Sequence, residues 1–197
     1  MADELPELIV ADAEGWRAWL ATSGSASRGV RLVLAKKGTV APTSLTYDQA
    51  LDEALCDGWI DGQIGRRDDA TYRQRFTPRR PRSGWSRRNV GLVEALIASG
   101  RMRARGLAEV ERAKADGRWE AVYAGSATIE VPADFSAALE GDPAARAAWD
   151  GLNRANRYAV LYRVDQAKRP ETRARRVEQL VAMLARGETI HPQRARP

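Results

Sequence analysis

A length of 197 residues, with 44% hydrophobic and 29% charged side chains, is typical of an ordinary globular protein that has one well-packed domain and room for a helical extension. The chain contains no apolar run near the ~20 residues that a membrane helix needs, which excludes a membrane span. The opening segment, MADELPELIV, is acidic and lacks the basic start and apolar core of a secretory signal, so we expect a cytoplasmic protein.

Cysteine and histidine are too scarce for several classes of site. The single cysteine, Cys56, excludes an internal disulfide and a multi-cysteine zinc site, and the single histidine, His191, lies in a tail rich in Pro and Arg. We therefore expect no metal centre, no Ser-His-Asp triad and no cofactor. The formal net charge is +6 and most basic residues are arginine, which a GC-rich genome explains as well as phosphate recognition does.

The expected elements begin with a helix, a strand and a second helix. Asp12 is placed to cap a first helix that has a Trp-rich face. The alternation of apolar residues over 30–36 predicts a strand. Thr46, followed three residues later by Gln49, forms a capping box and predicts a helix that ends at Gly58.

Two further strands follow. Residues 59–65 and 71–77 alternate with the period of strands, and the polar segment 67–70 suits a hairpin turn. Together with residues 30–36 they predict one small antiparallel sheet. Helices should follow after Ser86, over 104–115, after Pro132, from Asp142 to Trp149, around Tyr158 to Tyr162, and from Pro170 to Gly187, with an irregular connection over 119–130.

This pattern predicts a helix-dominated α+β protein with a three-stranded antiparallel sheet packed with helices and a C-terminal helical layer. Residues 1–125 hold the sheet and its helices. Residues 126–190 form a helical subdomain that docks on this core, and residues 191–197 form a frayed tail.

The predicted binding site lies on the two strands of the hairpin. Trp59 and Asp61 share one strand face, and Arg73 and Arg75 share a face of the next strand. If these faces coincide, an Asp–Arg pair lies beside a Trp ring. This pair is either a structural ion pair that sets the register, or part of a concave patch in which Trp stacks a planar ligand and Arg holds an anionic group.

The loop after the hairpin extends this site. It carries several arginines between prolines and leads to a helix whose free N–H groups favour an anion, although a solvated basic loop explains the same pattern. Lys37, at the end of the first strand, adds charge to the same end. We predict no catalytic and no metal-binding residues; the candidate ligand-binding residues are Lys37, Trp59, Asp61, Arg73, Arg75, Arg79 and Trp85.

Two other features carry no predicted site. Cys56 follows an apolar helical face and is interpreted as a small buried hydrophobe, because the helix end and the adjacent Asp57 both raise a thiol pKa. Arg173 and Glu178 belong to a charged segment that is interpreted as an exposed helix face with i, i+4 pairing.

Four segments in this order resemble one known family. They are EALCDGWIDG at 53–62, YRQRFTPRRP at 72–81, GWSRRNV at 84–90 and AKRPETRARRVEQLVAML at 167–184. Together they are similar, over nearly the whole chain, to the YdeI/OmpD-associated family, also called bacteriocin-protection proteins. The resemblance implies a role in stress and antimicrobial-peptide resistance and an association with an outer-membrane porin, but no defined reaction.

Three hypotheses of function follow. The first is a non-catalytic binder of an anionic or planar small molecule or peptide, acting in antimicrobial or stress tolerance. The second is nucleic-acid binding by the 79–88 loop and the sheet surface, with Tyr72, Phe76 and Trp85 as stacking groups. The third is an acid–base enzyme that uses Asp61 or Glu53, which ranks last because neither has an evident means of reaching a pKa near neutral pH.

Overall fold

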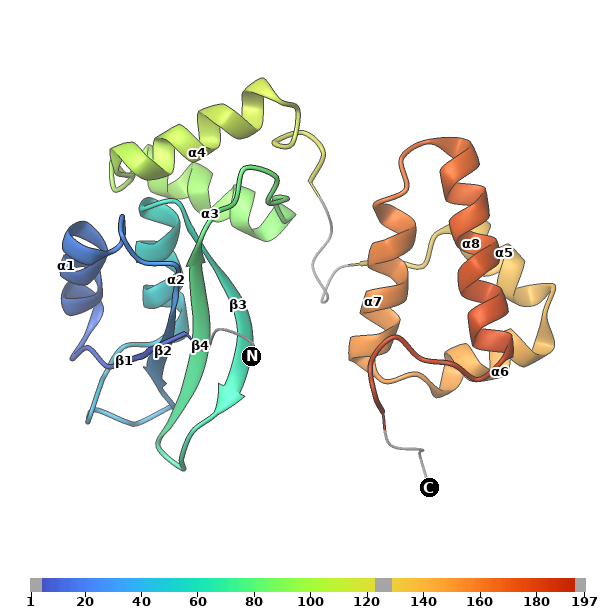
Figure 1. Ribbon diagram of the computed structural model, residues 1–197, viewed down its shortest axis with the longest axis horizontal. Coiled ribbons are helices and arrows are strands. Elements are labelled where there is room, and N and C mark those ends of the chain that lie inside the picture. Colours follow the sequence, from blue (N-terminus) through green and yellow to red (C-terminus); the bar gives the residue numbers. More distant parts are fainter. Residues whose placement is uncertain (1–4, 123–128, 194–197) are drawn as a thin grey trace. The chain divides into compact units, whose positions relative to one another are not determined.

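The computed structural model covers the whole chain and describes residues 5–122 and 129–193. The chain divides into two compact units, residues 1–122 and residues 123–197 (Figure 1). The boundary expected at residue 125, and residues 123–128 of the expected irregular connection, lie outside the described residues.

The first unit contains every strand of the described chain. Its elements are β1 (Glu7–Leu8), α1 (Ala13–Ser23), β2 (Val30–Ala35), α2 (Tyr47–Cys56), β3 (Trp59–Arg66), β4 (Thr71–Pro78), α3 (Arg87–Ala98) and α4 (Ala104–Ala115). The predicted N-caps are confirmed: the side chains of Asp12, Thr46 and Ser86 each accept a hydrogen bond from a backbone N–H in the first turn of their helix. Local capping chemistry therefore sets where these helices begin.

The sheet is mixed and has four strands in the order β1-β2-β4-β3. The three predicted strands are confirmed as β2, β3 and β4, which pair antiparallel. The prediction of a purely antiparallel, three-stranded sheet is wrong because β1 adds a parallel edge, with Glu7 opposite Arg31 and Leu8 opposite Leu32. A two-residue strand is too short to show a periodic pattern in the sequence.

One face of the sheet forms the core of the first unit with helices α1 and α2 (Figure 1). Trp16 of α1 is fully buried, and its ring lies 6.0 Å from Trp59 and 5.8 Å from Phe76, centroid to centroid. The Trp16 Nε1–H donates a 3.1 Å hydrogen bond to the Ala50 carbonyl of α2. The Trp-rich face of the first helix is therefore a packing surface rather than a binding surface.

Cys56 lies at the end of α2 and is fully buried, which confirms its interpretation as a small hydrophobe. Burial raises the pKa of its thiol to about 11. Because the thiolate is the reactive form, at pH 7.5 a thiol reagent should modify the native chain at least about a hundredfold more slowly than the unfolded chain. Absorbance-monitored thiol titration with and without denaturant measures the two rates, and similar rates would show that Cys56 is accessible.

The second unit is helical throughout its described residues. Its elements are α5 (Ala133–Glu140), α6 (Pro143–Gly151), α7 (Arg154–Asp165) and α8 (Pro170–Ala185). Pro143 and Pro170 occupy the first helical turn, as predicted. The core is built around Phe135 and Trp149, whose rings meet edge to face at 5.3 Å. Among the described residues of either unit, no helix is both long and apolar enough to cross a membrane.

The C-terminal segment is held to α7 by a buried amide. Asn156 is fully buried, accepts a 2.8 Å hydrogen bond from the His191 backbone N–H, and donates one of 3.0 Å to the His191 carbonyl. The Asn156 amide also donates to the Gln193 side chain at 3.0 Å. The prediction of a frayed tail is therefore wrong for residues 191–193, whereas residues 194–197 lie outside the described residues.

Candidate functional site

The structure buries both tryptophans of the predicted site. Trp59 is 2% exposed and packs against Trp16 in the core of the first unit. Trp85 is also 2% exposed, with the Arg79 guanidinium 3.5 Å above its ring and Trp119 at 4.9 Å. Neither indole offers a free face to a planar ligand, so the predicted stacking wall is not formed.

Asp61 and Arg75 lie on opposite faces of the sheet. Asp61 is opposite Phe76 in the register of β3 and β4, so it shares the core face and not the face of Arg75. It accepts a 2.8 Å hydrogen bond from the Tyr47 hydroxyl of α2. Burial, together with the Asp61 carboxylate, raises the pKa of Tyr47 to about 12. The expected Asp61–Arg75 pair is therefore wrong, and Asp61 serves to join β3 to α2.

The remaining predicted residues are spread over the first unit. Lys37 is exposed just beyond the end of β2. Arg79 is 6% exposed and donates to the Gly84 carbonyl at 3.1 Å, so it orders its own loop. Arg73 and Arg75 are half-buried on the sheet face that does not form the core. The structure thus brings the predicted residues together in separate pairs, Arg73 with Arg75 on this face and Arg79 with Trp85 in the loop, and not in one site.

Nucleic-acid binding through the predicted stacking groups does not fit this geometry. Phe76 is fully buried, Trp85 is nearly so, and Tyr72 lies on the core face of β4. Bases stack on aromatic rings only where a ring face is open to solvent. The basic loop therefore lacks the aromatic platform that this hypothesis requires.

The carboxylate proposed for acid–base chemistry belongs to a network of arginines. Glu53 is buried and accepts hydrogen bonds from Arg103 at 2.8 Å and Arg101 at 3.0 Å. Burial alone would raise the pKa of Glu53, but these two hydrogen bonds outweigh it and lower the pKa below its usual value. A general base or acid works best with a pKa near the ambient pH, so this environment disfavours such a role for Glu53.

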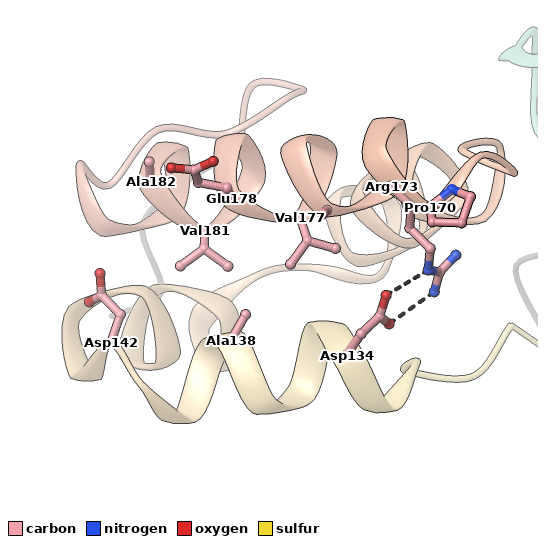
Figure 2. Close-up of a pocket in the computed structure, with 10 residues that line it drawn as sticks. Asp134, Ala138, Asp142, Pro170, Arg173, Val177, Glu178, Val181 and Ala182 are labelled. Carbon is pink, nitrogen blue, oxygen red and sulfur yellow. Dashed lines mark hydrogen bonds and ion pairs between the residues drawn. The ribbon is translucent and has the colours of Figure 1, made fainter.

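A groove in the second unit is the candidate binding site (Figure 2). Its volume is about 710 Å³ and it runs along α8 opposite α5. Figure 2 shows the side chains of Val177, Val181 and Ala138 between these two helices. The residues that line the groove are Asp134, Ala138, Asp142, Pro170, Arg173, Ala174, Val177, Glu178, Val181 and Ala182.

The ends of the groove carry its charge. At one end the Arg173 guanidinium donates to both oxygens of Asp134, at 2.6 and 2.9 Å, and this pairing lowers the pKa of Asp134 (Figure 2). At the other end Asp142 caps α6 by accepting from the Ala144 and Ala145 backbone N–H groups. Glu178 is exposed and makes no hydrogen bond or ion pair within the described residues. The groove therefore has an apolar floor and an excess of negative charge.

The sequence pattern does not predict this site. It indicates that Arg173 and Glu178 lie on an exposed helix face with local i, i+4 pairs, whereas Arg173 pairs with Asp134, 39 residues away. One signal was available, because the small and apolar residues of α8 recur at helical spacing along the lining stripe: Pro170, Ala174, Val177, Val181 and Ala182. Within the described residues no cluster of His, Cys, Asp or Glu is arranged to hold a metal ion.

Comparison with known families gives two matches. Residues 8–109, more than half of the chain, match the family described as a domain of unknown function, DUF8412. Residues 128–187 match the family described as bacteriocin-protection, YdeI or OmpD-associated. The resemblance stated from the sequence is thus confirmed, but over the helical unit rather than over nearly the whole chain.

Comparison with curated proteins and with solved structures gave no match. Every residue that lines the α5–α8 groove lies inside the bacteriocin-protection match. The chain belongs to the DUF8412 family through its first unit, and residues 128–187 match the bacteriocin-protection, YdeI or OmpD-associated family.

Proposed function

We propose that this protein is a non-catalytic, cytoplasmic binding protein that acts in tolerance to antimicrobial peptides, and that it holds a basic amphipathic helix in the α5–α8 groove. The observation that carries this proposal is the composition of the groove, which combines an apolar floor with carboxylates at its ends. Concave apolar sites with a few placed polar groups are the usual form of a binding site.

The shape of the groove suits a helix. Its lining residues follow one stripe of α8 from Pro170 to Ala182, which corresponds to roughly 18 Å of helix axis. A peptide helix of about 12 residues has the same length. Such a helix presents apolar side chains at i, i+3, i+4 and i+7 to a groove of this kind, as in other helix-in-groove complexes.

The charge of the groove selects a basic helix. The chain as a whole carries +6, so a basic peptide is repelled by most of its surface. Glu178 has no partner among the described residues, and the Arg173 charge is already offset by Asp134. A basic side chain that enters the groove therefore meets uncompensated negative charge.

The family description supports the biological role. The domain that contains the groove matches proteins described as bacteriocin-protecting. Antimicrobial peptides commonly form helices with Lys and Arg on one face and apolar residues on the other. Sequestration of such a peptide requires binding but no reaction, and it uses the surface that the groove provides.

A designed peptide tests the proposal. We expect a labelled helix of about 12 residues, with Leu and Lys at amphipathic spacing, to bind the full chain saturably in fluorescence anisotropy. Ala138→Trp should weaken this binding at least about tenfold, because the indole occupies the floor that the peptide would cover. Ala137→Trp is the matched control, since Ala137 is exposed on the same helix and does not line the groove.

A second peptide tests the charge. The same sequence with Glu in place of Lys keeps the apolar face, so a merely hydrophobic groove would bind both peptides. The proposal requires that the acidic peptide bind at least about tenfold more weakly at low ionic strength. Equal binding of the two peptides, or equal loss in the Ala138→Trp and Ala137→Trp variants, would contradict it.

A further inference from the structure

The segment that joins β4 to the first turn of α3, residues 79–88, contains five arginines and no acidic residue. Two of these arginines stabilise the first unit itself. The Arg79 guanidinium lies 3.5 Å from the centre of the Trp85 ring, and Arg88 forms an ion pair with Asp48 at 3.3 Å. The fold therefore accounts for only part of this positive charge.

The other three arginines of the segment, Arg80, Arg82 and Arg87, are exposed and are called the loop arginines below. Their side chains make no hydrogen bond, ion pair or ring contact within the described residues. Arg87 also lies in the first turn of α3, where the helix dipole disfavours a positive charge and no acidic residue offsets it. An anionic partner would stabilise these three uncompensated charges.

Hydrogen bonds fix the backbone that carries the loop arginines. The Ser83 N–H donates to the Arg80 carbonyl at 2.9 Å, and the Arg80 N–H donates to Ser83 Oγ at 3.0 Å. Arg118, which follows α4, donates to the Ser83 carbonyl at 2.7 Å. The Arg79 N–H donates to the Gly58 carbonyl at 3.0 Å. A backbone that is already ordered loses little conformational entropy when its side chains bind a partner.

The chemistry of this segment distinguishes between three kinds of polyanion. Single-stranded nucleic acid binds through bases that stack on open aromatic rings, and the one ring of the segment, that of Trp85, is only 2% exposed. Basic segments that attach to a membrane commonly insert apolar side chains beside their charges, and residues 79–88 contain no exposed large hydrophobic residue. A nucleic-acid duplex requires neither feature, because its backbone presents one negative charge per ~1.7 Å of helix axis.

We infer that the loop arginines bind the phosphate backbone of a nucleic-acid duplex without reading its base sequence. Each guanidinium presents a planar fork of N–H donors that matches two phosphate oxygens. Residues 80–87 span at most roughly 25 Å when fully extended, a length over which one duplex presents many phosphates. Phosphate contacts carry no sequence information, so the binding should be non-specific. This surface lies in the first unit and does not depend on the peptide groove.

Fluorescence anisotropy of the full chain with a labelled DNA duplex of mixed sequence tests the inference. The logarithm of the association constant should fall with the logarithm of the salt concentration at a slope of about −2.7, which corresponds to three phosphate contacts. Arg80→Gln, Arg82→Gln and Arg87→Gln should each reduce the magnitude of this slope by about 0.9 and weaken binding about tenfold at about 50 mM salt. The same measurement with an RNA duplex distinguishes the two sources of such a backbone.

Arg66→Gln is the matched control, and it should change the slope little. Arg66 is exposed, and its side chain makes no hydrogen bond or ion pair within the described residues. It lies opposite Tyr72, and the length of β4, about 20 Å, separates this position from Pro78, where the basic segment begins. The variant with all three loop arginines replaced by Gln should keep the melting temperature of the unsubstituted chain, because none of these side chains stabilises the fold.

The inference is overturned if the duplex shows no saturable binding, if the slope is near zero, or if Arg66→Gln loses as much affinity as the loop-arginine variants. Tighter binding of a single strand than of the duplex would also contradict it. Sedimentation with vesicles of phosphatidylcholine and phosphatidylserine tests for a membrane partner. The unsubstituted chain should stay in solution, whereas vesicle binding that the triple Gln variant loses would overturn the inference in favour of a lipid surface.

Discussion

Replacing Asp57 with alanine is expected to lower the free energy of unfolding by about 3 kcal/mol. The Asp57 carboxylate is 3% exposed and joins the end of α2 to the start of α4. It accepts hydrogen bonds from Arg103 Nε at 2.6 Å and from Arg105 Nη2 at 2.8 Å. Its removal would leave Arg105 without its carboxylate and Arg103 with Glu53 alone, and loss of one member of such a group costs more than the group contributes.

Chemical denaturation monitored by tryptophan fluorescence measures this change. The matched control is Asp48→Ala, which removes an ion pair from the other end of the same helix. Asp48 is 87% exposed and lies 3.3 Å from Arg88, so its loss should cost less than about 1 kcal/mol. If the two variants were equally stable, the Asp57 network would contribute no more than a surface ion pair.

A methyl group at Gly106 is expected to have a comparable effect, about 3 kcal/mol for Gly106→Ala. The Cβ atom would lie 2.3 Å from the Cys56 carbonyl oxygen and 2.8 Å from Met102 Cε. The same carbonyl accepts a 3.1 Å hydrogen bond from the Arg103 backbone N–H. Helix α4 would have to move away from α2 to relieve the contact, which would strain this bond and the Arg103 pairings.

Gly91→Ala is the control for this prediction and should have the opposite sign. Gly91 is exposed in the middle of α3, and a Cβ atom there meets nothing within 4 Å. Alanine in a helix is favoured over glycine by roughly 0.5–1 kcal/mol, so Gly91→Ala should stabilise the chain. Thermal unfolding of the two variants should shift in opposite directions. Unchanged stability of Gly106→Ala would contradict the close approach of α4 to the end of α2. A destabilised Gly91→Ala would contradict the open surroundings of Gly91 in α3.

Much of the fold was predictable because its signals are local. The capping box of Thr46 and Gln49 involves residues three apart, and the alternation of the hairpin strands is visible within each segment. The two-residue β1 was not predictable, since it is a strand only because Glu7 and Leu8 pair with β2. The attachment of His191 to Asn156 also joins residues 35 apart and leaves no local pattern.

The predicted site failed at the register between the two hairpin strands. Alternation showed correctly that Trp59 shares a face with Asp61, and Arg73 with Arg75. The turn and the irregularity between Asp61 and Ile64 set the register of β3 and β4, and the register decides which face of β3 lies beside the face of β4 that carries Arg73 and Arg75. A register shift by one residue moves every side chain of a strand to the opposite face of the sheet. The sequence pattern does not determine that choice. The aromatic rings also pack in the core of the first unit, and a ring that is buried there has no face free to bind a ligand.

The groove could not be predicted from the sequence for a different reason. Its walls come from α5 and α8, whose lining residues Asp134 and Arg173 are far apart in the chain. The apolar stripe of α8 was assigned to the core alone, because the sequence does not show how much of a helix face its neighbours cover. Val177 and Val181 are nearly buried, yet they form the floor of an open site.

The most direct test of the groove as a peptide site is an amide NMR titration of the full chain with the basic Leu/Lys helix. The proposal predicts that the largest chemical-shift changes occur along one stripe of α5 and α8, at residues such as Ala138, Val177 and Ala182. The amide resonances of β4 and α4, which belong to the first unit, should move little. Shifts absent from α5 and α8, or centred on the first unit, would contradict the account.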